Sequence, residues 1–398
     1  MIVSALEKLG NQKLLIVLLA VITAIISIQN YNVTPDPNGS PTQELTLYSN
    51  YLIFKNSFFH LIHHQNLYIF YSSERVDFFK YSPTFALFMA PLAVLPNFLG
   101  LFLWNFLNLF ILYLAIWKLP IAPQKRKLLA LLFIVMEAIT AMQNSQSNSL
   151  IAGLIILAFL SLEKNKTGLA ALFIVTTIFI KIFGGLAFVL FLLYPHKLKA
   201  VIYSALWFAV LILAPLLVVT PVELLGIYKS WWGLLSSDYN GSEGLSVMAW
   251  IDVWFGITNC KQVIVLLGLM LFCIPLLRYP QFQSQKFRLL ILASTLLWVI
   301  IFNHKAESPT FVIAVAGLVI WFFSQAASPF NTVLLLLALV FTILSPTDIF
   351  PAHIRNDIFI PYVVKVVPCI LIWFKLTYDL LRSDFRPSPD RLPSKEFS

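Results

Sequence analysis

Residues 168–195 read GLAALFIVTTIFIKIFGGLAFVLFLLYP, an apolar stretch interrupted by Lys181 and by Gly184-Gly185. Basic residues flank the stretch on both sides, at Lys166 and Lys197. Loops rich in lysine and arginine stay in the cytoplasm, so both ends of the stretch are predicted to lie there. Two helices of about 14 residues are each roughly 20 Å long, too short for a bilayer core of about 30 Å. The stretch therefore predicts a broken hairpin in the membrane with a cation at its tip.

The amino-acid composition indicates that the rest of the chain also lies in the membrane. Of its 398 residues, 59% are hydrophobic and 11% are charged, against roughly 25% charged residues in a soluble domain. Apolar runs of about 15 to 22 residues recur almost to the C-terminus, and a helix needs about 20 residues to cross a bilayer. The sequence predicts an all-α, polytopic transmembrane helical protein with about 12–13 membrane segments. These segments lie near residues 14–31, 82–97, 99–117, 128–143, 148–162, 167–180, 183–195, 200–219, 262–277, 289–303, 309–325, 331–345 and 359–379.

Basic loops set the predicted topology. We expect one transmembrane domain over residues 1–381 and a cytoplasmic tail over residues 382–398. The first outer loop covers residues 32–80, and the second covers residues 221–260 and carries several tryptophans. Along the rest of the chain, loops rich in lysine and arginine alternate with loops that are not, as the positive-inside rule requires. This alternation places both termini in the cytoplasm.

An even number of crossings is needed if both termini are cytoplasmic, whereas thirteen apolar segments are present. Either residues 45–63 enter the bilayer, or residues 81–96 form a half-helix near the outer surface. Residues 45–64 also read as an amphipathic helix that lies in the interface. Its predicted anchors are Tyr48, Tyr51, Phe54, Phe58 and Phe59.

Several classes of protein are excluded by what the sequence lacks. The net charge of +9 is scattered over short loops, so we expect no nucleic-acid partner. The three cysteines have no paired spacing, and we predict that they are packing residues, with no metal and no cofactor. A glycine-rich phosphate loop, a serine nucleophile elbow and a dinucleotide fingerprint are also missing. A nucleotide-sugar donor usually needs a cytoplasmic domain, but a lipid-borne donor does not.

Ionisable groups at membrane depth are costly and are functional candidates by default. Lys181 can hold a phosphate, although a lysine that snorkels to the interface would have the same sequence. The outer turn at residues 302–309 brings together His304, Lys305 and Glu307, which can orient a sugar hydroxyl and neutralise a phosphate leaving group. An ordinary polar turn is the structural alternative.

Two more polar groups stand at the outer ends of apolar segments. Gln146 and Asn148 suit sugar hydroxyls, although they also suit a helix cap. Asp77 precedes an apolar segment and has Arg75 and Lys80 beside it, so its carboxylate can serve as a base while the cations face phosphate oxygens. A solvated loop charge is the alternative for Asp77. Glu137 lies within a predicted span and either pairs with another helix or faces the groove.

A resemblance to a known family follows from several short motifs. Tyr81-Ser82-Pro83-Thr84-Phe85 and the segment at residues 89–96, MAPLAVLP, resemble the Tyr-x-Pro and Pro-Leu-x-x-Leu-Pro pattern of glycosyltransferase family 87. These are polyprenyl-phosphate-mannose-dependent mannosyltransferases of the GT-C superfamily. Gln146-Ser147-Asn148 resembles the family's Gly-Gln-x-Asn turn with the glycine replaced, and Asn66-Leu67-Tyr68 is similar to its Asn-Pro-Tyr. Lys181 resembles its lysine between two short helices, and the likeness covers about residues 46–310.

The resemblance implies a GT-C-like fold and a multi-pass protein of the bacterial plasma (inner) membrane. It implies transfer of a hexose, mannose above all, from a polyprenyl-phosphate donor to a glycolipid or glycan acceptor on the non-cytoplasmic face. The lipid bilayer is itself a partner in this reading. The alternatives are a transporter or flippase of lipid-linked glycan and a glycan polymerase or ligase; no internal repeat of the kind that transporters show is visible.

One motif departs from the family's pattern. The family usually places a catalytic aspartate in its first outer loop, in an Asp-x-x-x-Tyr context, and the matching stretch here is Asn50-Tyr51-Leu52-Ile53-Phe54. Because an asparagine cannot act as a base, either Asp77 takes that role or this member has altered or lost the reaction. Together, the residues' own chemistry and the resemblance predict Asp77 and His304 as catalytic residues and Asn50, Lys80, Tyr81, Gln146, Asn148, Lys181, Lys305 and Glu307 as substrate-binding residues.

Overall fold

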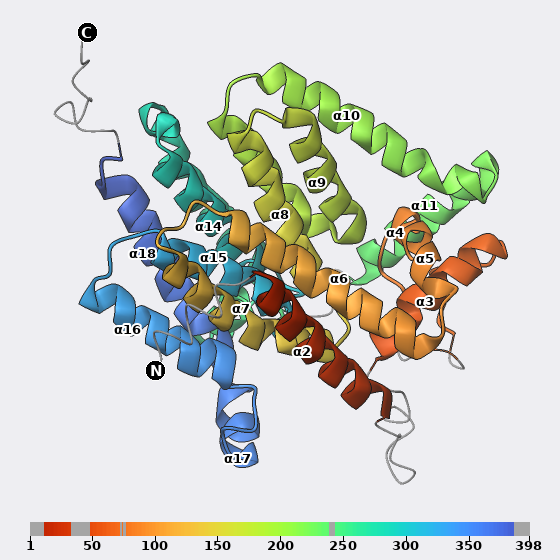
Figure 1. Cartoon of the computed structure of the whole chain (residues 1–398), viewed down its shortest axis with the longest axis horizontal. Coiled ribbons are helices and arrows are strands. Elements are labelled where there is room, and N and C mark those ends of the chain that lie inside the picture. The colour runs from red at the N-terminus through yellow and green to blue at the C-terminus, as the bar shows by residue number, and fades with distance from the viewer. Residues whose placement is uncertain (1–11, 33–47, 72–73, 75–76, 239–242, 386–398) are drawn as a thin grey trace.

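The structure is a computed structural model that describes residues 12–32, 48–71, 74, 77–238 and 243–385. All regular elements in these ranges are helices, which confirms the all-α prediction (Figure 1). The longer ones are α2 (Gln12–Asn32), α3 (Ser49–Ile62), α6 (Asn97–Lys118), α7 (Gln124–Gln143), α8 (Asn148–Glu163), α9 (Thr167–Ile180), η1 (Ile182–Leu193), α10 (Lys197–Leu213), α11 (Pro221–Asp238), α12 (Val247–Phe255), α13 (Lys261–Cys273), α14 (Gln285–Ile301), α15 (Phe311–Phe323), α16 (Pro329–Leu337) and α18 (Val367–Arg382). The shorter ones are α4 (Pro83–Phe88), α5 (Ala90–Ala93), η2 (Ala214–Leu217), η3 (Ile274–Leu277), η4 (Tyr279–Gln283), η5 (Ser308–Thr310), η6 (Ala338–Leu344), α17 (Ala352–Ile354), η7 (Arg355–Phe359) and η8 (Val364–Val366).

Length and hydropathy mark the chain as an integral membrane protein. In the described ranges, three helices are long and apolar enough to cross a bilayer unaided: Gln12–Asn32, Asn97–Lys118 and Lys197–Leu217. The pair formed by Ala352–Phe359 and Val364–Arg382 also qualifies if it is taken as one span bent by 81°. Six further apolar helices of 10–17 residues accompany them.

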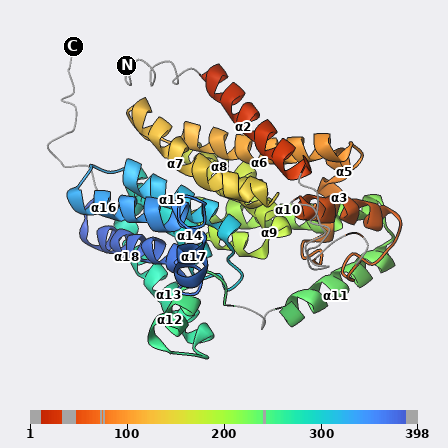
Figure 2. The same ribbon diagram turned by 90° about the horizontal axis from the view of Figure 1, so that it is seen from below.

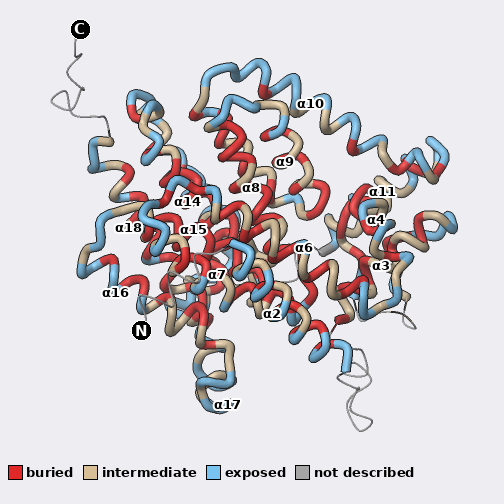
Figure 3. The backbone as a smooth tube through the Cα atoms, in the orientation of Figure 1, coloured by how far each residue is buried: buried red, intermediate tan, exposed pale blue. Residues whose placement is uncertain are grey.

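The core lies where α8, α14 and α15 meet. α14 packs against α15, and α8 packs between α6 and α9. In Figure 3 these central helices are mostly buried, whereas α10 at the periphery is mostly exposed. Beyond the two lysines at its start, Lys197 and Lys199, its exposed side chains are apolar or aromatic, for example Leu198 at 72% and Val201 at 65% exposure. A long apolar helix with such a surface is stable only when lipid covers it.

The segment predicted as a span at residues 82–97 is not a full span. It forms α4 and α5, which together cover residues 83–93, or about 16 Å of helix against a bilayer core of about 30 Å. Pro83 stands in the first turn of α4, where the Ser82 hydroxyl caps the helix by accepting a hydrogen bond from the Phe85 N–H at 3.1 Å. Pro91 likewise stands in the first turn of α5, which has no side-chain cap. Of the two alternatives left by the odd segment count, the structure matches the half-helix.

The helix predicted at residues 45–64 is present as α3, but three of its five predicted aromatic anchors are wrong. Tyr48, Tyr51 and Phe54 are buried inside the protein. The Phe54 ring meets the rings of Tyr81 and Phe85 edge-on, at centroid distances of 4.8 and 5.2 Å. Tight packing of this kind draws α3 onto α4 rather than into the lipid interface.

The hairpin at residues 168–195 breaks at Lys181, as predicted. α9 ends at Ile180, and Lys181 has an extended backbone (φ −141°, ψ 125°) before η1 starts. Gly184 allows the two arms to approach closely, since a Cβ there would lie 2.3 Å from Thr177 Oγ1. Lys181 therefore lies between two helices and not on a helix face. Its extended backbone at the break sets the direction of its side chain.

The two ends of the helical bundle carry different polar groups. At one end, Arg126 donates hydrogen bonds to the Phe323 and Gln325 carbonyl oxygens, and Arg278 donates to those of Leu380 and Ser383. This end carries the basic loops that were predicted to be cytoplasmic. The outer polar groups gather at the opposite end.

Topology is testable by cysteine accessibility in intact cells. In a background without the native cysteines, we expect cysteines at Lys125, Lys197 and Lys286 to react only after the membrane is permeabilised. Cysteines at Asp77 and Trp231 should react from outside, because basic loops are retained in the cytoplasm. Labelling of position 197 from the outside would contradict the arrangement.

Glu137 pairs with another helix rather than facing the groove. Its Oε1 lies 2.7 Å from Lys365 Nζ, and the exposed fractions of the two side chains are 0% and 6%. Lys365 is held in turn by Thr342, whose hydroxyl donates to the Lys365 carbonyl oxygen at 2.8 Å. The pair ties the segment after residue 363 to α7. Cys369 is buried nearby, which agrees with the packing role predicted for it, whereas Cys273 is exposed and Cys260 is half-buried.

Removing one partner of this buried pair should destabilise the protein. We expect Lys365→Met to lower the free energy of unfolding by about 3 kcal/mol, because the Glu137 carboxylate is left without its counter-ion. Lys375→Met is the matched control, since Lys375 pairs with Asp379 at a more exposed position. Denaturant unfolding in detergent measures the difference. Equal free energies of unfolding for the two variants would show that the buried pair stabilises the protein no more than the less buried pair does.

Candidate functional site

A cavity of about 820 Å³ opens at the end of the bundle opposite the basic loops. Its walls come from α3, the segment before α4, the α7–α8 turn, the α9–η1 break, α11, and α14 with the turn that follows it. In Figures 1 and 2, α11 lies at the edge of the bundle on the same side as α3, and it contributes four residues to the cavity lining. The lining residues are Asn50, Ile53, Asp77, Phe78, Lys80, Tyr81, Gln146, Ile180, Lys181, Ile182, Phe183, Trp231, Trp232, Leu235, Ser236, Trp298, Val299, Phe302, Asn303, His304, Lys305 and Glu307.

The residues that the sequence singled out converge on this cavity. Nine of the ten line it, namely Asn50, Asp77, Lys80, Tyr81, Gln146, Lys181, His304, Lys305 and Glu307. The tenth, Asn148, is fully buried behind them and contacts Lys181. They come from five segments far apart in sequence. Their shared location is a geometric finding, and their roles in binding and catalysis stay a prediction.

Lys181 forms the centre of the polar wall. Its Nζ donates to Gln146 Oε1 at 3.1 Å and to Asn148 Oδ1 at 2.9 Å. Asn148 is fixed from behind because its Nδ2 donates to the Pro309 carbonyl oxygen at 3.0 Å. The Tyr81 hydroxyl also donates to Gln146 Oε1, at 3.3 Å. Burial raises the pKa of this hydroxyl above its usual range, so Tyr81 acts as a hydrogen-bond donor and not as a base.

The turn between α7 and α8 is held in place by neighbouring helices. Trp104 of α6 donates from Nε1 to the Ser145 carbonyl oxygen at 2.8 Å. Asn30 of α2 donates from Nδ2 to the Met142 and Gln143 carbonyl oxygens at 3.2 and 3.0 Å. These bonds satisfy carbonyl groups left over at the end of α7. They also position Gln146 and Asn148 around the lysine.

Asp77 and Lys80 stand at the mouth of the cavity and form an ion pair of 3.1 Å between Oδ2 and Nζ. The other carboxylate oxygen of Asp77 accepts a hydrogen bond from the Phe78 N–H at 2.7 Å. Trp231 of α11 donates from Nε1 to the Lys80 carbonyl oxygen at 3.0 Å, which fastens the first outer loop to the second. Arg75, the other predicted neighbour of Asp77, lies outside the described residues.

The turn at residues 303–307 carries the remaining polar groups. Glu307 and Thr310 cap each other's backbone at the start of η5, with the Glu307 N–H donating to Thr310 Oγ1 at 3.1 Å. Gly244 packs directly on this turn in a left-handed conformation (φ +55°), where a Cβ would lie 2.7 Å from the His304 carbonyl oxygen. Only glycine fits such a position. His304 and Lys305 are thereby held at the cavity by the backbone of the second outer loop.

Apolar and aromatic side chains form a further part of the lining, the aromatic wall. It consists of Ile182 and Phe183 of η1, Trp232 of α11, Trp298 of α14 and Phe302 directly after α14. The Phe183 ring centroid lies 5.9 Å from Lys181 Nζ, so this wall adjoins the lysine. The Trp298 and Phe302 rings stack at a centroid distance of 5.1 Å. Sequence reasoning missed this wall and the helices α11 and α12 within the second outer loop. The only signal for them was the group of tryptophans in that loop, which is common at membrane interfaces.

Asn50 occupies the cavity wall through an amide and not a carboxylate. Its Nδ2 donates to the Asn144 carbonyl oxygen at 2.9 Å and so joins α3 to the α7–α8 turn. In this geometry Asn50 is a structural link that also faces the cavity. Within the described ranges, no group of three or more His, Cys, Asp or Glu side chains is arranged to hold a metal ion.

Comparison with known proteins gives one family. The sequence profile of glycosyltransferase family 87 matches residues 78–346, more than half of the chain. The matched region includes every residue that lines the cavity except Asn50, Ile53 and Asp77. No match to the chain was found among curated proteins.

Proposed function

Because the chain belongs to glycosyltransferase family 87 and is a membrane glycosyltransferase, we propose that its donor is a hexose, mannose by family resemblance, carried on a polyprenyl phosphate. The acceptor is a glycolipid or a glycan, and transfer takes place in the outer cavity, on the non-cytoplasmic face of a bacterial plasma membrane. The observation that carries the proposal is that this cavity is lined both by cationic and other polar side chains and by the aromatic wall, with Phe183 beside Lys181.

The two walls suit the two halves of an amphiphilic donor. Phe183, Trp232 and Phe302 offer apolar surface for an isoprenoid chain, since burying apolar area is favourable. Lys181 lies where the apolar wall gives way to the polar one, and it can hold the phosphate between chain and sugar. A water-soluble nucleotide sugar would leave the aromatic wall without a partner. The cavity therefore supports a lipid-linked donor.

The proposed reaction is a single displacement at the anomeric carbon. The Asp77 carboxylate takes the proton of the acceptor hydroxyl, and the acceptor oxygen forms a bond to the anomeric carbon. The bond between that carbon and the phosphate oxygen breaks, and its electron pair leaves with the polyprenyl phosphate. Lys181, Lys305 and His304 stabilise the charge that develops on the phosphate, and this electrostatic contribution is usually the largest one.

Sugar recognition falls to the uncharged hydrogen-bonding groups. Gln146 uses its carbonyl oxygen for Lys181 and Tyr81, which orients the amide. No described residue accepts from its Nε2, so these two donors serve a sugar hydroxyl. Glu307 adds an acceptor to the lining of the cavity. Such a site discriminates between hexoses, because a hexose with a misplaced hydroxyl leaves a buried polar group of the site without a hydrogen-bond partner.

The proposal is tested by supplying the purified full-length protein with three radiolabelled donors, one at a time, and total membrane lipid as acceptor. We expect label to move into a new product from polyprenyl-phosphate mannose and not from a nucleotide sugar. The rate of transfer from polyprenyl-phosphate glucose, compared with that from polyprenyl-phosphate mannose, shows which hexose the enzyme prefers. Transfer from the nucleotide sugar alone would contradict the lipid-linked donor, because it would not depend on the aromatic wall.

A further inference from the structure

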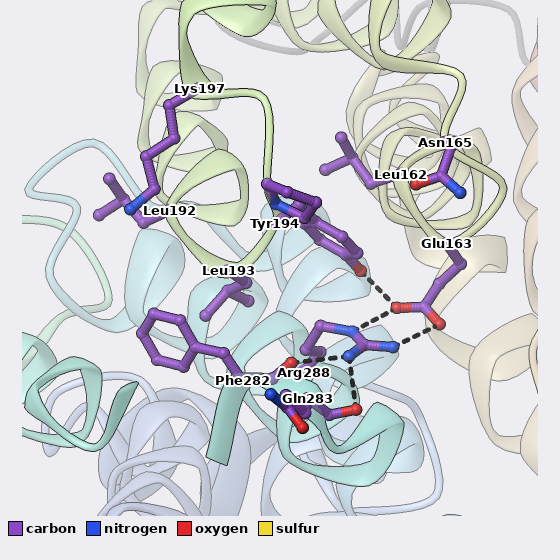
Figure 4. Close-up of a pocket in the computed structure, with 11 residues that line it drawn as sticks. Leu162, Glu163, Asn165, Leu192, Leu193, Tyr194, Lys197, Phe282, Gln283 and Arg288 are labelled. Atoms are coloured by element: carbon purple, nitrogen blue, oxygen red, sulfur yellow. Dashed lines mark hydrogen bonds and ion pairs between the residues drawn. The ribbon is translucent and has the colours of Figure 1, made fainter. Parts of the chain in front are cut away.

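A second cavity, of about 470 Å³, lies at the basic end of the bundle, far from the groups assigned to sugar transfer. It is formed where the end of η1, the end of α8, the start of α10 and the segment before α14 meet (Figure 4). Its floor is apolar and includes Leu193 and Phe282, its wall includes Arg288, and its exposed rim carries Leu192 and Lys197. An apolar floor under a cationic rim fits an amphiphilic anion.

Arg288 is fully engaged and builds the wall of this cavity. Its Nε and Nη2 bind the two Glu163 carboxylate oxygens at 2.6 and 2.9 Å, and its Nη1 donates to the Phe282 and Gln283 carbonyl oxygens at 2.7 and 2.9 Å. The Tyr194 hydroxyl adds a third bond to Glu163, at 2.5 Å. This two-pronged pairing neutralises the only carboxylate that lines the cavity and fixes the shape of the wall.

Lys197 has a different environment. No described residue forms an ion pair or a hydrogen bond with its ammonium group, which reaches along the cavity beside Leu192 in Figure 4. It is the first residue of α10, whose N-terminus has no side-chain cap. Unpaired N–H groups and the helix dipole at such an end add to the attraction for an anion. The Asn165 side chain stands across the cavity as a further hydrogen-bonding group.

The surrounding segments strengthen this positive field. Residues 163–167, 194–199 and 278–288 together contain seven lysines and arginines and a single acidic residue, Glu163. They connect helices whose outer surfaces are apolar and face lipid, as the exposure of Leu192 (47%) and Leu198 (72%) shows. The cavity thus lies at the level where lipid headgroups meet the protein.

We propose that this cavity binds the headgroup of an anionic phospholipid from the leaflet at the basic end of the bundle. The lipid phosphate lies between the Lys197 ammonium and the first turn of α10, and an acyl chain follows Leu192 and Phe282 into the bilayer. Basic pockets between transmembrane helices bind lipid headgroups in this manner. A free phosphate ion shares the charge but leaves the apolar floor uncovered.

The experiment uses the full-length protein in nanodiscs of phosphatidylcholine that contain increasing amounts of phosphatidylglycerol. Native mass spectrometry measures how much phosphatidylglycerol stays bound. We expect Lys197→Ala to weaken retention about five-fold, the contribution of one cation near a membrane surface. Lys199→Ala is the matched control, because it removes an equal charge two residues away and does not line the cavity. A second arm adds inorganic phosphate to nanodiscs of phosphatidylcholine alone and follows thermal stability.

Selective loss in Lys197→Ala, with stabilisation by phosphatidylglycerol but not by inorganic phosphate, supports the lipid site. Equal losses in Lys197→Ala and Lys199→Ala would overturn it in favour of a diffuse surface charge. Equal stabilisation by inorganic phosphate would overturn the lipid and leave a simple anion site. Both lysines are exposed at the start of α10, so neither substitution disturbs the core.

Discussion

Asp77→Asn is expected to reduce sugar transfer by about 10³-fold, within the range of 10² to 10⁴ that general-base catalysis contributes. The substitution keeps the size of the side chain and its bond from the Phe78 N–H, but it removes the group that accepts the proton of the acceptor hydroxyl. The Michaelis constant for the lipid donor should change little, because Lys181 and the aromatic wall remain. Initial rates at several donor concentrations separate the two effects.

Glu74→Gln is the matched control for this variant. Glu74 belongs to the same loop, but its carboxylate is bound by Asn56 and His60 and does not line the cavity. We expect its effect on the turnover number to be small. A turnover number for Asp77→Asn within a few-fold of the wild type would remove Asp77 as the base. Asn50 cannot replace it, so an unassigned group would then be required.

Lys181→Met is expected to reduce transfer by about 10² to 10³-fold, the effect of removing one group that stabilises developing charge in a dry site. The methionine fills similar space but leaves the leaving phosphate without its nearest cation. Binding of a polyprenyl-phosphate analogue should weaken as well, because the ammonium faces this phosphate before the reaction. Rates and binding in detergent are measured on the same preparation.

Lys229→Met provides the control, because Lys229 is an exposed cation on α11 that does not line the cavity. Thermal stability has to be followed in parallel, since Asn148 Oδ1 loses its hydrogen bond from Lys181. Unchanged binding and rate in a folded Lys181→Met protein would show that the lysine has only a structural role. The snorkelling interpretation would then hold.

Hydropathy predicted most of the helices because each apolar run is bounded by charged or polar turns. α8 and α9 begin at Asn148 and Thr167, within a residue of the predicted positions. The prediction of a span at residues 82–97 was wrong. The hydropathy of this segment matches that of a span, but Pro83, Pro91 and Pro96 divide its backbone. A proline within a helix removes a backbone donor and breaks the helix. Hydropathy does not record that effect.

The two outer loops show a different limit. Tyr51 and Phe54 have the spacing of interfacial anchors, but whether an aromatic residue faces lipid or protein depends on the partner packed against it. That partner, α4, could not be placed from the sequence. α11 was missed for a related reason, since its apolar residues surround much of its circumference and give no clear helical stripe.

The polar half of the candidate site could be identified because charges are rare next to apolar segments. Lys181, Gln146 and His304 stand out in a chain with 11% charged residues. The aromatic half could not, because phenylalanine and tryptophan occur throughout the chain and only the fold selects Trp232, Trp298 or Phe302. Lys365 was also missed, since its partner Glu137 lies more than 200 residues away in sequence.

The central claim is that the outer cavity is the place of transfer from a lipid carrier, and chemical blocking of the cavity tests it most directly. In a protein without Cys260, Cys273 and Cys369, a cysteine replaces either Ser236, which lines the cavity, or Leu225, which is 74% exposed on the same helix and does not line it. Each variant is treated with a bulky maleimide, and transfer from radiolabelled polyprenyl-phosphate mannose is then measured. We expect modification at position 236 to abolish transfer and modification at position 225 to leave it intact. Full transfer after complete modification at position 236 would contradict the claim.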